Sequence, residues 1–469
     1  MPLLSANTRP KENRCERDSL GYIGLPQFAL YGAQTARAIR NYPISGRKSH
    51  PAVTRAFLQI KLAAARANYH CGVLSRYELR LISNAIEYIL KCNESDWLDF
   101  FPVDPYQAGA GTSQNMNFNE VIANCSNLAL KVPLGTYSPI HPNDQVNKSQ
   151  STNDVYPTVI RLALLDVSKE QVTSVMSLSR AFKRCSEKWA RIPKSGRTHL
   201  QDAVPMFLGD EVGGYASTLN RCGAWLEKAR GELLEIGIGG SAVGNRINVP
   251  KPYPNLILKA LRKETGYDFF LSRDFFEMTQ SQAQLSYFSA IMRTLCLELT
   301  RICNDLRLLA SGPNTGLGEL KLPAVQPGSS IMPGKINPSI LEMVNQACYS
   351  ALGFDQTVAL CSQAGQLELN VMTPMMAYSL IESTVVLTHA IQVLEESCIK
   401  GITPQLTQLR KYSESTAQVA TSLSPSLGYA QVAELVREST ASGVPVMELA
   451  RKKSLAIQTW EAEGGKIRK

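Results

Sequence analysis

The sequence predicts an all-α protein, and two observations support this prediction. Apolar residues recur at alternating spacings of three and four over long stretches, while short alternating patterns typical of β-strands are scarce. The longest series places eight apolar side chains on one helical face, at Leu285, Phe288, Met292, Leu295, Leu299, Ile302, Leu306 and Leu309. Two similar series cover residues 175–189 and 380–398. Because a helix keeps such positions on one narrow stripe, each series predicts a long helix packed along its length.

Breaks rich in proline and glycine separate the predicted helices. They lie near residues 101–112, 139–143, 244–254, 311–338 and 401–404. From them we expect an N-terminal domain over residues 1–152, a long-helix domain over 153–407 and a small helical C-terminal domain over 408–469. Leu297 and Leu308 add apolar surface beside the longest stripe. A helix shared between subunits needs such extra apolar surface, so we expect an oligomer built on a helical-bundle core.

Composition excludes several classes of protein. The chain has 469 residues, of which 44% are hydrophobic, as in globular proteins, and no run of apolar residues is long enough to span a membrane. The N-terminus lacks an apolar core followed by a cleavage site, so we expect no secretion and a cytoplasmic location.

The spacing of the cysteines and the distribution of charge also indicate which sites and partners to expect. The eleven cysteines include no C-x-x-C pair, which predicts reduced thiols rather than disulfides or a metal site. The net charge of +9 is concentrated partly in a basic tail over residues 451–469, where Trp460 is the only aromatic residue. We interpret it as a solvated tail and expect no nucleic-acid partner.

Four segments between the predicted helices are rich in hydroxyls, amides and glycine. They cover residues 109–120, 141–154, 196–205 and 327–338. Each segment alone could consist of helix caps and loop turns. Together they combine many hydrogen-bond donors with His199 and Lys335, which is what binding of a small dicarboxylate requires. The sequence has no GxGxxG after a strand and no P-loop, so we expect no dinucleotide or ATP cofactor.

One of these segments resembles the signature of a known superfamily. Residues 328–337, G-S-S-I-M-P-G-K-I-N, match the G-S-S-x-x-P-x-K-x-N signature of the aspartase/fumarase superfamily at every fixed position. The resemblance extends from residue 31 to the C-terminal helices. Within the superfamily, the tracts at 147–154, 303–309 and 366–372 are more similar to aspartate ammonia-lyases than to fumarases.

The resemblance implies an architecture and an activity. It implies a three-domain chain in a homotetramer whose central helices form a twenty-helix bundle, with loops of three subunits at each active site. It also implies reversible elimination of ammonia from L-aspartate to give fumarate, by removal of the Cβ proton through an aci-carboxylate intermediate, without a cofactor or metal. Because charge develops on the β-carboxylate, preorganised donors around it are the expected solution.

The resemblance further assigns roles to individual residues. It implies that the β-carboxylate is held by the hydroxyls of Thr112, Ser151, Thr152 and Ser330. The amino group would be surrounded by Asn153, Thr198 and His199. The α-carboxylate would be clamped by Lys335 and Asn337, and the base would be Ser329.

Three of these assignments have alternatives. Ser329 is a weak base unless its alkoxide is stabilised. The loop over residues 323–338 that carries it is either a lid that excludes water as it closes or a static connector. His199 could instead be a helix-start residue bonded to the backbone. Glu342 could support the base loop, as the resemblance implies, or be a first-turn acid favoured by the helix dipole.

Two departures from the superfamily pattern concern the substrate. Its members usually have G-T-G-L-N where this chain has Arg246 within residues 244–248, and G-P-R where it has Asn314. Either these are compensating structural changes, or Arg246 reshapes the pocket for a modified aspartate. Fumarate hydratase activity is a second alternative. An inactive structural homologue, as among lens proteins of the superfamily, is a third, although such a role gives no reason to keep the full set of site residues.

Overall fold

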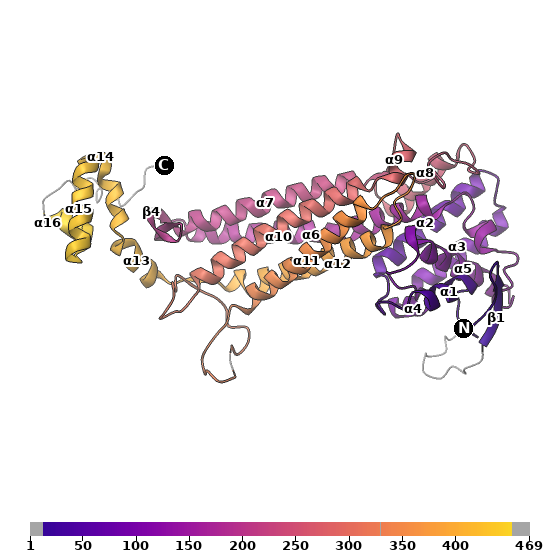
Figure 1. Ribbon diagram of the computed structural model, residues 1–469, viewed down its shortest axis with the longest axis horizontal. Helices are drawn as coiled ribbons and strands as arrows, with labels where there is room; N and C mark the ends of the chain where they lie inside the picture. Colours follow the sequence, from indigo (N-terminus) through magenta and orange to yellow (C-terminus); the bar gives the residue numbers. More distant parts are fainter. Residues whose placement is uncertain (1–12, 329, 453–469) are drawn as a thin grey trace. The chain divides into compact units, whose positions relative to one another are not determined.

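The computed structural model describes residues 13–328 and 330–452, and it confirms the all-α prediction (Figure 1). The described chain forms two compact units. The first contains the described residues up to Val172, together with Trp225–Thr294 and Ser350–Val386. The second contains Thr173–Ala224, Leu295–Tyr349 and the described residues from Leu387 onward. The division into three domains at residues 152 and 407 stays a prediction.

The N-terminal part of the first unit is a group of helices that follows one β-hairpin in the sequence. Its elements are β1 (Asn13–Asp18), β2 (Gly21–Pro26), α1 (Ala33–Asn41), α2 (Pro51–His70), α3 (Arg76–Lys91), α4 (Glu94–Phe100), η2 (Gly109–Gly111), α5 (Thr112–Leu128) and η3 (Pro142–Val146). A buried carboxylate orients α1, because Glu120 accepts hydrogen bonds from the backbone N–H groups of Gly32, Gln34 and Thr35. These are free donors at a helix start, which a carboxylate stabilises.

Five long helices follow. They are α6 (Thr152–Lys188), α7 (Leu208–Glu232), α10 (Ala283–Leu309), α11 (Ser339–Gln363) and α12 (Thr373–Ser397). All eight residues of the predicted stripe on α10 are buried, which confirms the periodicity argument. All eleven cysteines are free thiols, as predicted.

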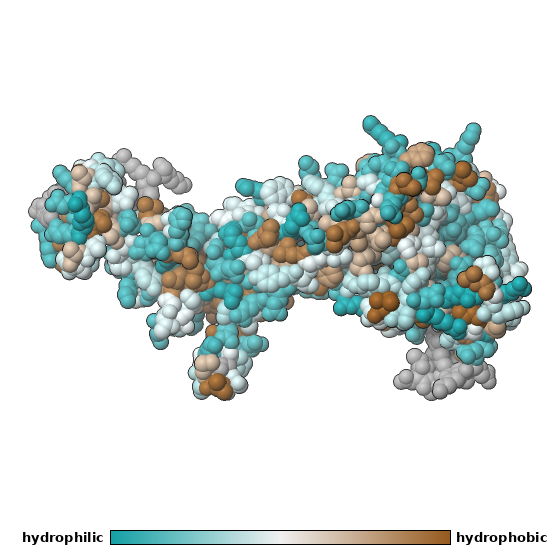
Figure 2. Space-filling model, viewed as in Figure 1, coloured by the Kyte–Doolittle hydropathy of each residue, from teal (hydrophilic) through white to brown (hydrophobic). Residues whose placement is uncertain are grey.

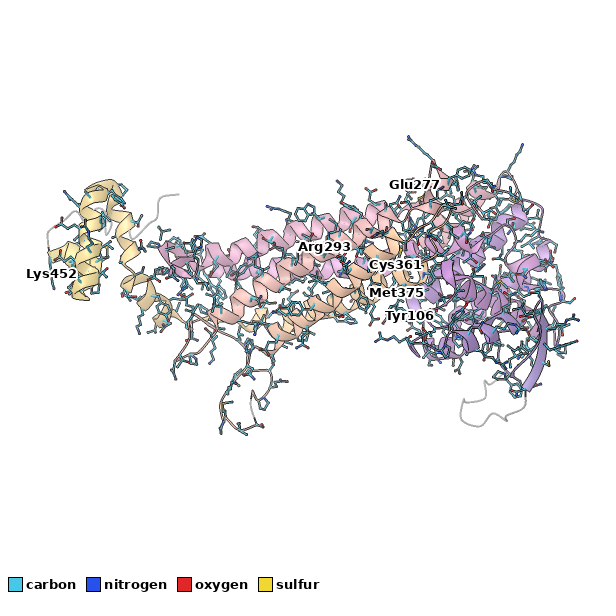
Figure 3. All side chains as sticks on the ribbon, viewed as in Figure 1. Tyr106, Glu277, Arg293, Cys361, Met375 and Lys452 are labelled. Carbon is cyan, nitrogen blue, oxygen red and sulfur yellow. The ribbon has the colours of Figure 1, made fainter. Side chains whose placement is uncertain are left out.

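Hydrogen bonds from polar side chains join some of these helices within each unit. In the first unit, Asp355 on α11 accepts bonds from Ser289 (2.7 Å) and Arg293 (3.0 Å) on α10. Arg293 is labelled in Figure 3. In the second unit, Ser179 on α6 donates to the carbonyl of Ala216 on α7 at 2.8 Å. Within each unit, these pairs of long helices therefore lie side by side.

Short elements connect the long helices. They are β3 (Pro193–Thr198), β4 (Gln201–Phe207), β5 (Glu235–Ile236), α8 (Tyr253–Thr265), β6 (Phe270–Leu271), α9 (Phe275–Gln280), β7 (Leu320–Lys321), η4 (Ile399–Gly401) and β8 (Thr403–Pro404). The strands pair two by two, and only β5 and β6 are parallel. No larger sheet forms among the described residues, which agrees with the scarcity of alternating patterns.

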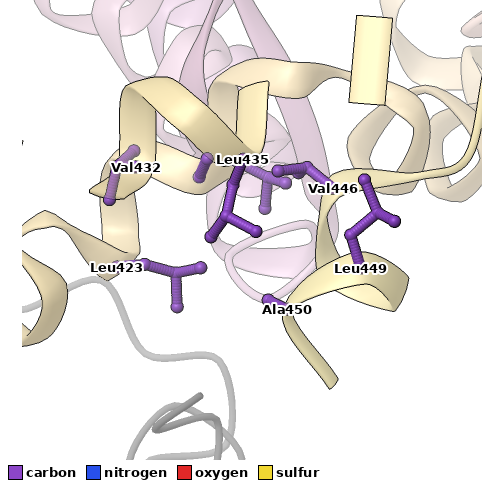
Figure 4. Packing of buried hydrophobic residues seen from close by; sticks show 8 residues of the cluster. Leu423, Val432, Leu435, Val446, Leu449 and Ala450 are labelled. Carbon is purple, nitrogen blue, oxygen red and sulfur yellow. The ribbon is translucent and has the colours of Figure 1, made fainter. Parts of the chain in front are cut away.

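The C-terminal helices have an apolar cluster of their own. The elements are α13 (Leu406–Ser415), η5 (Ala417–Leu423), α14 (Ser424–Leu427), α15 (Tyr429–Ser442) and α16 (Val446–Lys452). Leu423, Leu435, Val446 and Leu449 pack together in this cluster (Figure 4). Most of the predicted basic tail, residues 453–469, lies outside the described residues.

Apolar residues also reach the surface of the long helices. Leu297 is 55% exposed and Leu308 41% exposed on α10, and Tyr349 and Leu360 are exposed on α11. Figure 2 shows several separate apolar patches on one face of the protein. Among the described residues, one helical segment, Thr373–Gly401, has the length and mean hydropathy (1.2) of a membrane span, but 61% of the window is buried inside the protein. A core helix of a bundle has the same properties.

Candidate active site

The first predicted site residue, Thr112, begins α5 after a turn that only small residues permit. Gly111 has φ +83°, and a Cβ atom there would lie 2.2 Å from the ring of Tyr156 on α6. The preceding Ala110 donates its N–H to the carbonyl of Val371 at 2.8 Å. This close approach brings the start of α5, with its exposed Thr112, against the first turns of α6.

The start of α6 carries three more predicted site residues, Ser151, Thr152 and Asn153. Asn115, one turn beyond Thr112 on α5, donates its side-chain N–H to the hydroxyl oxygen of Thr152 at 3.0 Å. The structure therefore brings the N-terminal ends of α5 and α6 together, with hydroxyl residues at both. Two helix N-termini supply free N–H groups and partial positive charge, which suits a carboxylate.

The buried carboxylate of Asp154 holds the turn at residues 239–242 against the start of α6. Asp154 accepts hydrogen bonds from the N–H groups of Ser151 (3.0 Å), Gly239 (2.9 Å) and Ser241 (3.0 Å). Burial raises the pKa of Asp154 to about 6, against these hydrogen bonds, which lower it. The neighbouring Asn153 donates to the carbonyl of Ala242 at 2.7 Å. Residues 239–242 are thus fixed to the start of α6.

Arg246, the departure from the superfamily pattern, lies in the same turn. Its φ of +62° is in the left-handed region that favours glycine, which explains why glycine is usual at this position. Its guanidinium carbon lies 4.2 Å from the centre of the Phe275 ring. The charged group is therefore occupied by a cation–π contact at the protein surface. Asn314, the second departure, lies exposed in the loop after α10.

His199 and Thr198 lie at the tip of the hairpin formed by β3 and β4. Thr198 pairs with Gln201, so His199 and Leu200 form a two-residue turn, with φ values of +56° and +59°. Such a turn normally uses asparagine or glycine, and strained residues of this kind cluster at functional sites. His199 is exposed and is not at a helix start, which excludes the helix-start alternative.

The base of this hairpin is held by buried charges. Lys194, 1% exposed, forms ion pairs with Glu211 (2.7 Å) and with the fully buried Glu319 (3.1 Å). Arg197 also pairs with Glu319, at 2.7 Å. A firmly anchored base therefore carries an exposed tip.

The signature loop connects α10 to α11 and is drawn in Figure 1 as a long excursion between them. Ser329 lies outside the described residues. Ser330 and Lys335 are exposed, and the loop closes at its base, where Gly328 donates its N–H to the carbonyl of Lys335 at 2.9 Å. Asn337, which the resemblance places on the α-carboxylate, donates its side-chain N–H to the carbonyl of Gly328. Its contact in the single chain therefore stabilises the loop itself.

Glu342 lies in the first turn of α11, where its carboxylate is 3.6 Å from the guanidinium of Arg307 on α10. It thus ties the C-terminal end of the loop to α10.

The predicted site residues are divided between the two units. The first unit holds Thr112, Ser151, Thr152, Asn153 and Arg246. The second unit holds Thr198, His199, Ser330, Lys335, Asn337 and Glu342. The structure brings the residues of the α5 and α6 starts together.

Sequence reasoning missed the buried groups behind these residues, above all Lys61, Asn115 and Asp154. One signal was available for Lys61. It lies four residues after Phe57 and three before Ala64, on the buried face of α2, where a charged residue is out of place. Among the described residues, no group of three or more histidine, cysteine or acidic side chains could hold a metal ion.

Long helices with hydroxyl-bearing starts, together with an exposed loop that carries a lysine, are suited to binding a small anion. Comparison with known proteins gives the family. The family model described as lyase matches residues 21–353. The chain belongs to this lyase family, within the aspartase/fumarase superfamily.

Three relatives illustrate the similarity. The chain is 42% identical to the aspartate ammonia-lyase of Pseudomonas canavaninivorans over 445 residues, which cover 94% of this chain and 93% of that protein. It is similar to a cobalt-bound crystal structure of fumarate lyase:delta crystallin from Brucella melitensis, with 42% identity, a TM-score of 0.92, and coverage of 96% and 97% of the two chains. It also resembles recombinant class II fumarase from Schistosoma mansoni, at 30% identity and a TM-score of 0.91, over 96% and 98% of the chains.

Proposed function

We propose that the protein is an aspartate ammonia-lyase, which interconverts L-aspartate with fumarate and ammonium without a cofactor. The observation that carries the proposal is the meeting of the α5 and α6 N-termini, with Thr112 and Thr152 at their starts, in a member of the lyase family. The similarity to aspartate ammonia-lyases over 94% of the chain supports this choice of substrate.

The chemistry explains why such an arrangement is useful. The Cβ proton of aspartate is very weakly acidic, and its removal moves negative charge onto the β-carboxylate. Donors that are already fixed in place stabilise this charge without reorganisation. In the proposed site, Thr112, Ser151 and Thr152 donate hydroxyl hydrogens to the β-carboxylate, and the two helix starts add positive potential.

The remaining roles belong to the exposed segments of the second unit. Ser329 removes the proton, Ser330 adds a donor to the β-carboxylate, and Lys335 with Asn337 binds the α-carboxylate. Thr198 and His199, together with Asn153, surround the amino group. Because Lys335 and His199 are exposed in the single chain, they are free to enter a site completed by neighbouring subunits. We therefore propose a cytoplasmic homotetramer in which three subunits contribute to each site.

An assay of the purified protein tests this function. L-aspartate, L-malate, and fumarate with ammonium are offered in turn, and fumarate is followed by its ultraviolet absorbance. We expect fumarate from aspartate. Fumarate from malate but not from aspartate would favour fumarate hydratase, the second candidate, which the similarity to class II fumarase supports.

A single substitution tests the proposed base. Ser329→Ala should reduce turnover to background, because no other group is proposed to remove the Cβ proton, while light scattering shows the same assembly as wild type. Ser217→Ala is the matched control, since Ser217 is exposed on α7 and its hydroxyl bonds only to the carbonyl of Gly213 among described residues. Full activity of Ser329→Ala would remove Ser329 from the mechanism.

A further inference from the structure

A buried lysine lies behind the segment that begins α6. Lys61 on α2 is 1% exposed, and its Nζ donates to the side-chain oxygens of Asn147 (3.0 Å) and Gln150 (3.1 Å). Gln150 can only present its oxygen there, because its side-chain N–H groups donate to the carbonyls of Val146 and Lys148. Burial lowers the pKa of Lys61 to about 7, but both protonation states keep the two hydrogens that the two oxygens require.

Lys61 thereby fixes the direction of the next hydrogen bonds. Asn147 turns its oxygen toward the lysine while its N–H donates to the carbonyl of Gln150, and that same oxygen accepts a hydrogen bond from the Asn115 side chain at 3.2 Å. The atom of Asn115 that faces it must then be the nitrogen. The second hydrogen of this nitrogen goes to the hydroxyl oxygen of Thr152, at 3.0 Å.

Thr152 is consequently an acceptor toward the protein. A hydroxyl has one hydrogen to donate, and among the described residues none accepts it from Thr152. Thr152 lies at the start of α6 with 8% of its surface exposed, so this hydrogen remains available to a ligand at the helix start.

We propose that Lys61 and Asn115 are positioning residues that set the direction of this buried hydrogen-bond chain, so that Thr152 donates its hydroxyl hydrogen to the substrate β-carboxylate. The inference rests on the proposed function, which places the β-carboxylate at Thr152. Without a fixed direction, the Thr152 hydroxyl could turn toward the protein, and the developing negative charge would lose a donor.

Two isosteric substitutions distinguish an effect of hydrogen-bond direction on kcat from an effect of side-chain packing. Asn115→Asp replaces the donor with an acceptor, so Thr152 should donate to the new carboxylate, and kcat should fall about a hundredfold, as on loss of one donor to a developing oxyanion. Asn147→Asp is the matched control, because it also places a carboxylate in the chain but still accepts from Lys61 and Asn115. It loses only the weak bond from its N–H to the carbonyl of Gln150 (3.3 Å), so kcat should fall less than about tenfold.

A double-mutant cycle shows whether the effect passes through Thr152. In a Thr152→Val background, where no hydroxyl remains to be directed, Asn115→Asp should lower kcat by less than about threefold further. Values of kcat and KM are measured separately, and assembly is verified by light scattering. Equal losses in Asn115→Asp and Asn147→Asp, or an undiminished loss in the Thr152→Val background, would overturn the inference.

Lys61→Met decides the question if Asn115→Asp does not assemble. It removes the donor that sets the direction while keeping the length of the side chain, and we expect kcat to fall about tenfold. Wild-type kcat in this variant would overturn the inference. Wild-type protein with no activity toward aspartate would instead refute the proposed function, and the inference with it.

Discussion

Arg246 replaces the glycine that is usual in the superfamily with little loss of folding free energy. Its left-handed backbone conformation costs about 1 kcal/mol more for arginine than for glycine. The cation–π contact with Phe275 returns about 0.5 to 1 kcal/mol at an exposed site. Because the guanidinium is engaged by Phe275, we interpret Arg246 as a structural substitution rather than a determinant of substrate choice.

Arg246→Gly tests this interpretation. The variant regains backbone freedom in a left-handed position and loses the ring contact, so its stability should stay within about 1 kcal/mol of wild type. Steady-state kinetics with aspartate should show an unchanged KM. A marked gain or loss of affinity for aspartate would instead identify Arg246 as a residue that shapes the pocket for a modified substrate.

At the scale of elements, the turn before α5 decides where the helix starts meet. Gly111 allows the backbone to lie against the ring of Tyr156, and the phenol of Tyr156 in turn donates to Gln114 on α5 at 2.8 Å. A side chain at residue 111 would push the two helix starts apart. The placement of the α5 start against the α6 start therefore depends on Gly111, a residue without a side chain.

We predict that Gly111→Ala destabilises the protein by about 2 to 4 kcal/mol, because the new methyl group is overpacked and the backbone has φ +83°. Thermal unfolding measures the loss, and kcat should fall as well. Gly214→Ala on α7 is the control, since no heavy atom lies within 4 Å of its added Cβ. In a helix interior the control should gain roughly 0.5 to 1 kcal/mol. Similar melting temperatures for both variants would contradict the prediction.

At the scale of the whole molecule, the long helices expose more apolar surface than a single chain can cover. Leu297 and Leu308 were expected from the sequence to extend the apolar surface of α10, and both are exposed in the single chain. An apolar side chain at a subunit interface gains from leaving water, whereas a charge there must be desolvated.

Leu297→Lys should therefore yield smaller species than wild type in size-exclusion chromatography with light scattering, together with lower activity, because each proposed site needs several subunits. Leu20→Lys is the control, because Leu20 is 78% exposed and lies in the turn between β1 and β2, not on a long helix. A wild-type protein that is monomeric, or a Leu297→Lys protein with unchanged assembly, would contradict the expected use of this surface.

The sequence by itself determined the helical class, the helices with three- and four-residue spacing, and the superfamily, because these depend on local periodicity and on a short contiguous signature. Only the tertiary structure decided which polar groups meet. Lys61 contacts Asn147 across 86 residues of sequence, and Asn115 reaches Thr152 from a different helix. Such contacts are set by packing of whole helices. The direction of a hydrogen bond then follows from which atoms that packing leaves face to face.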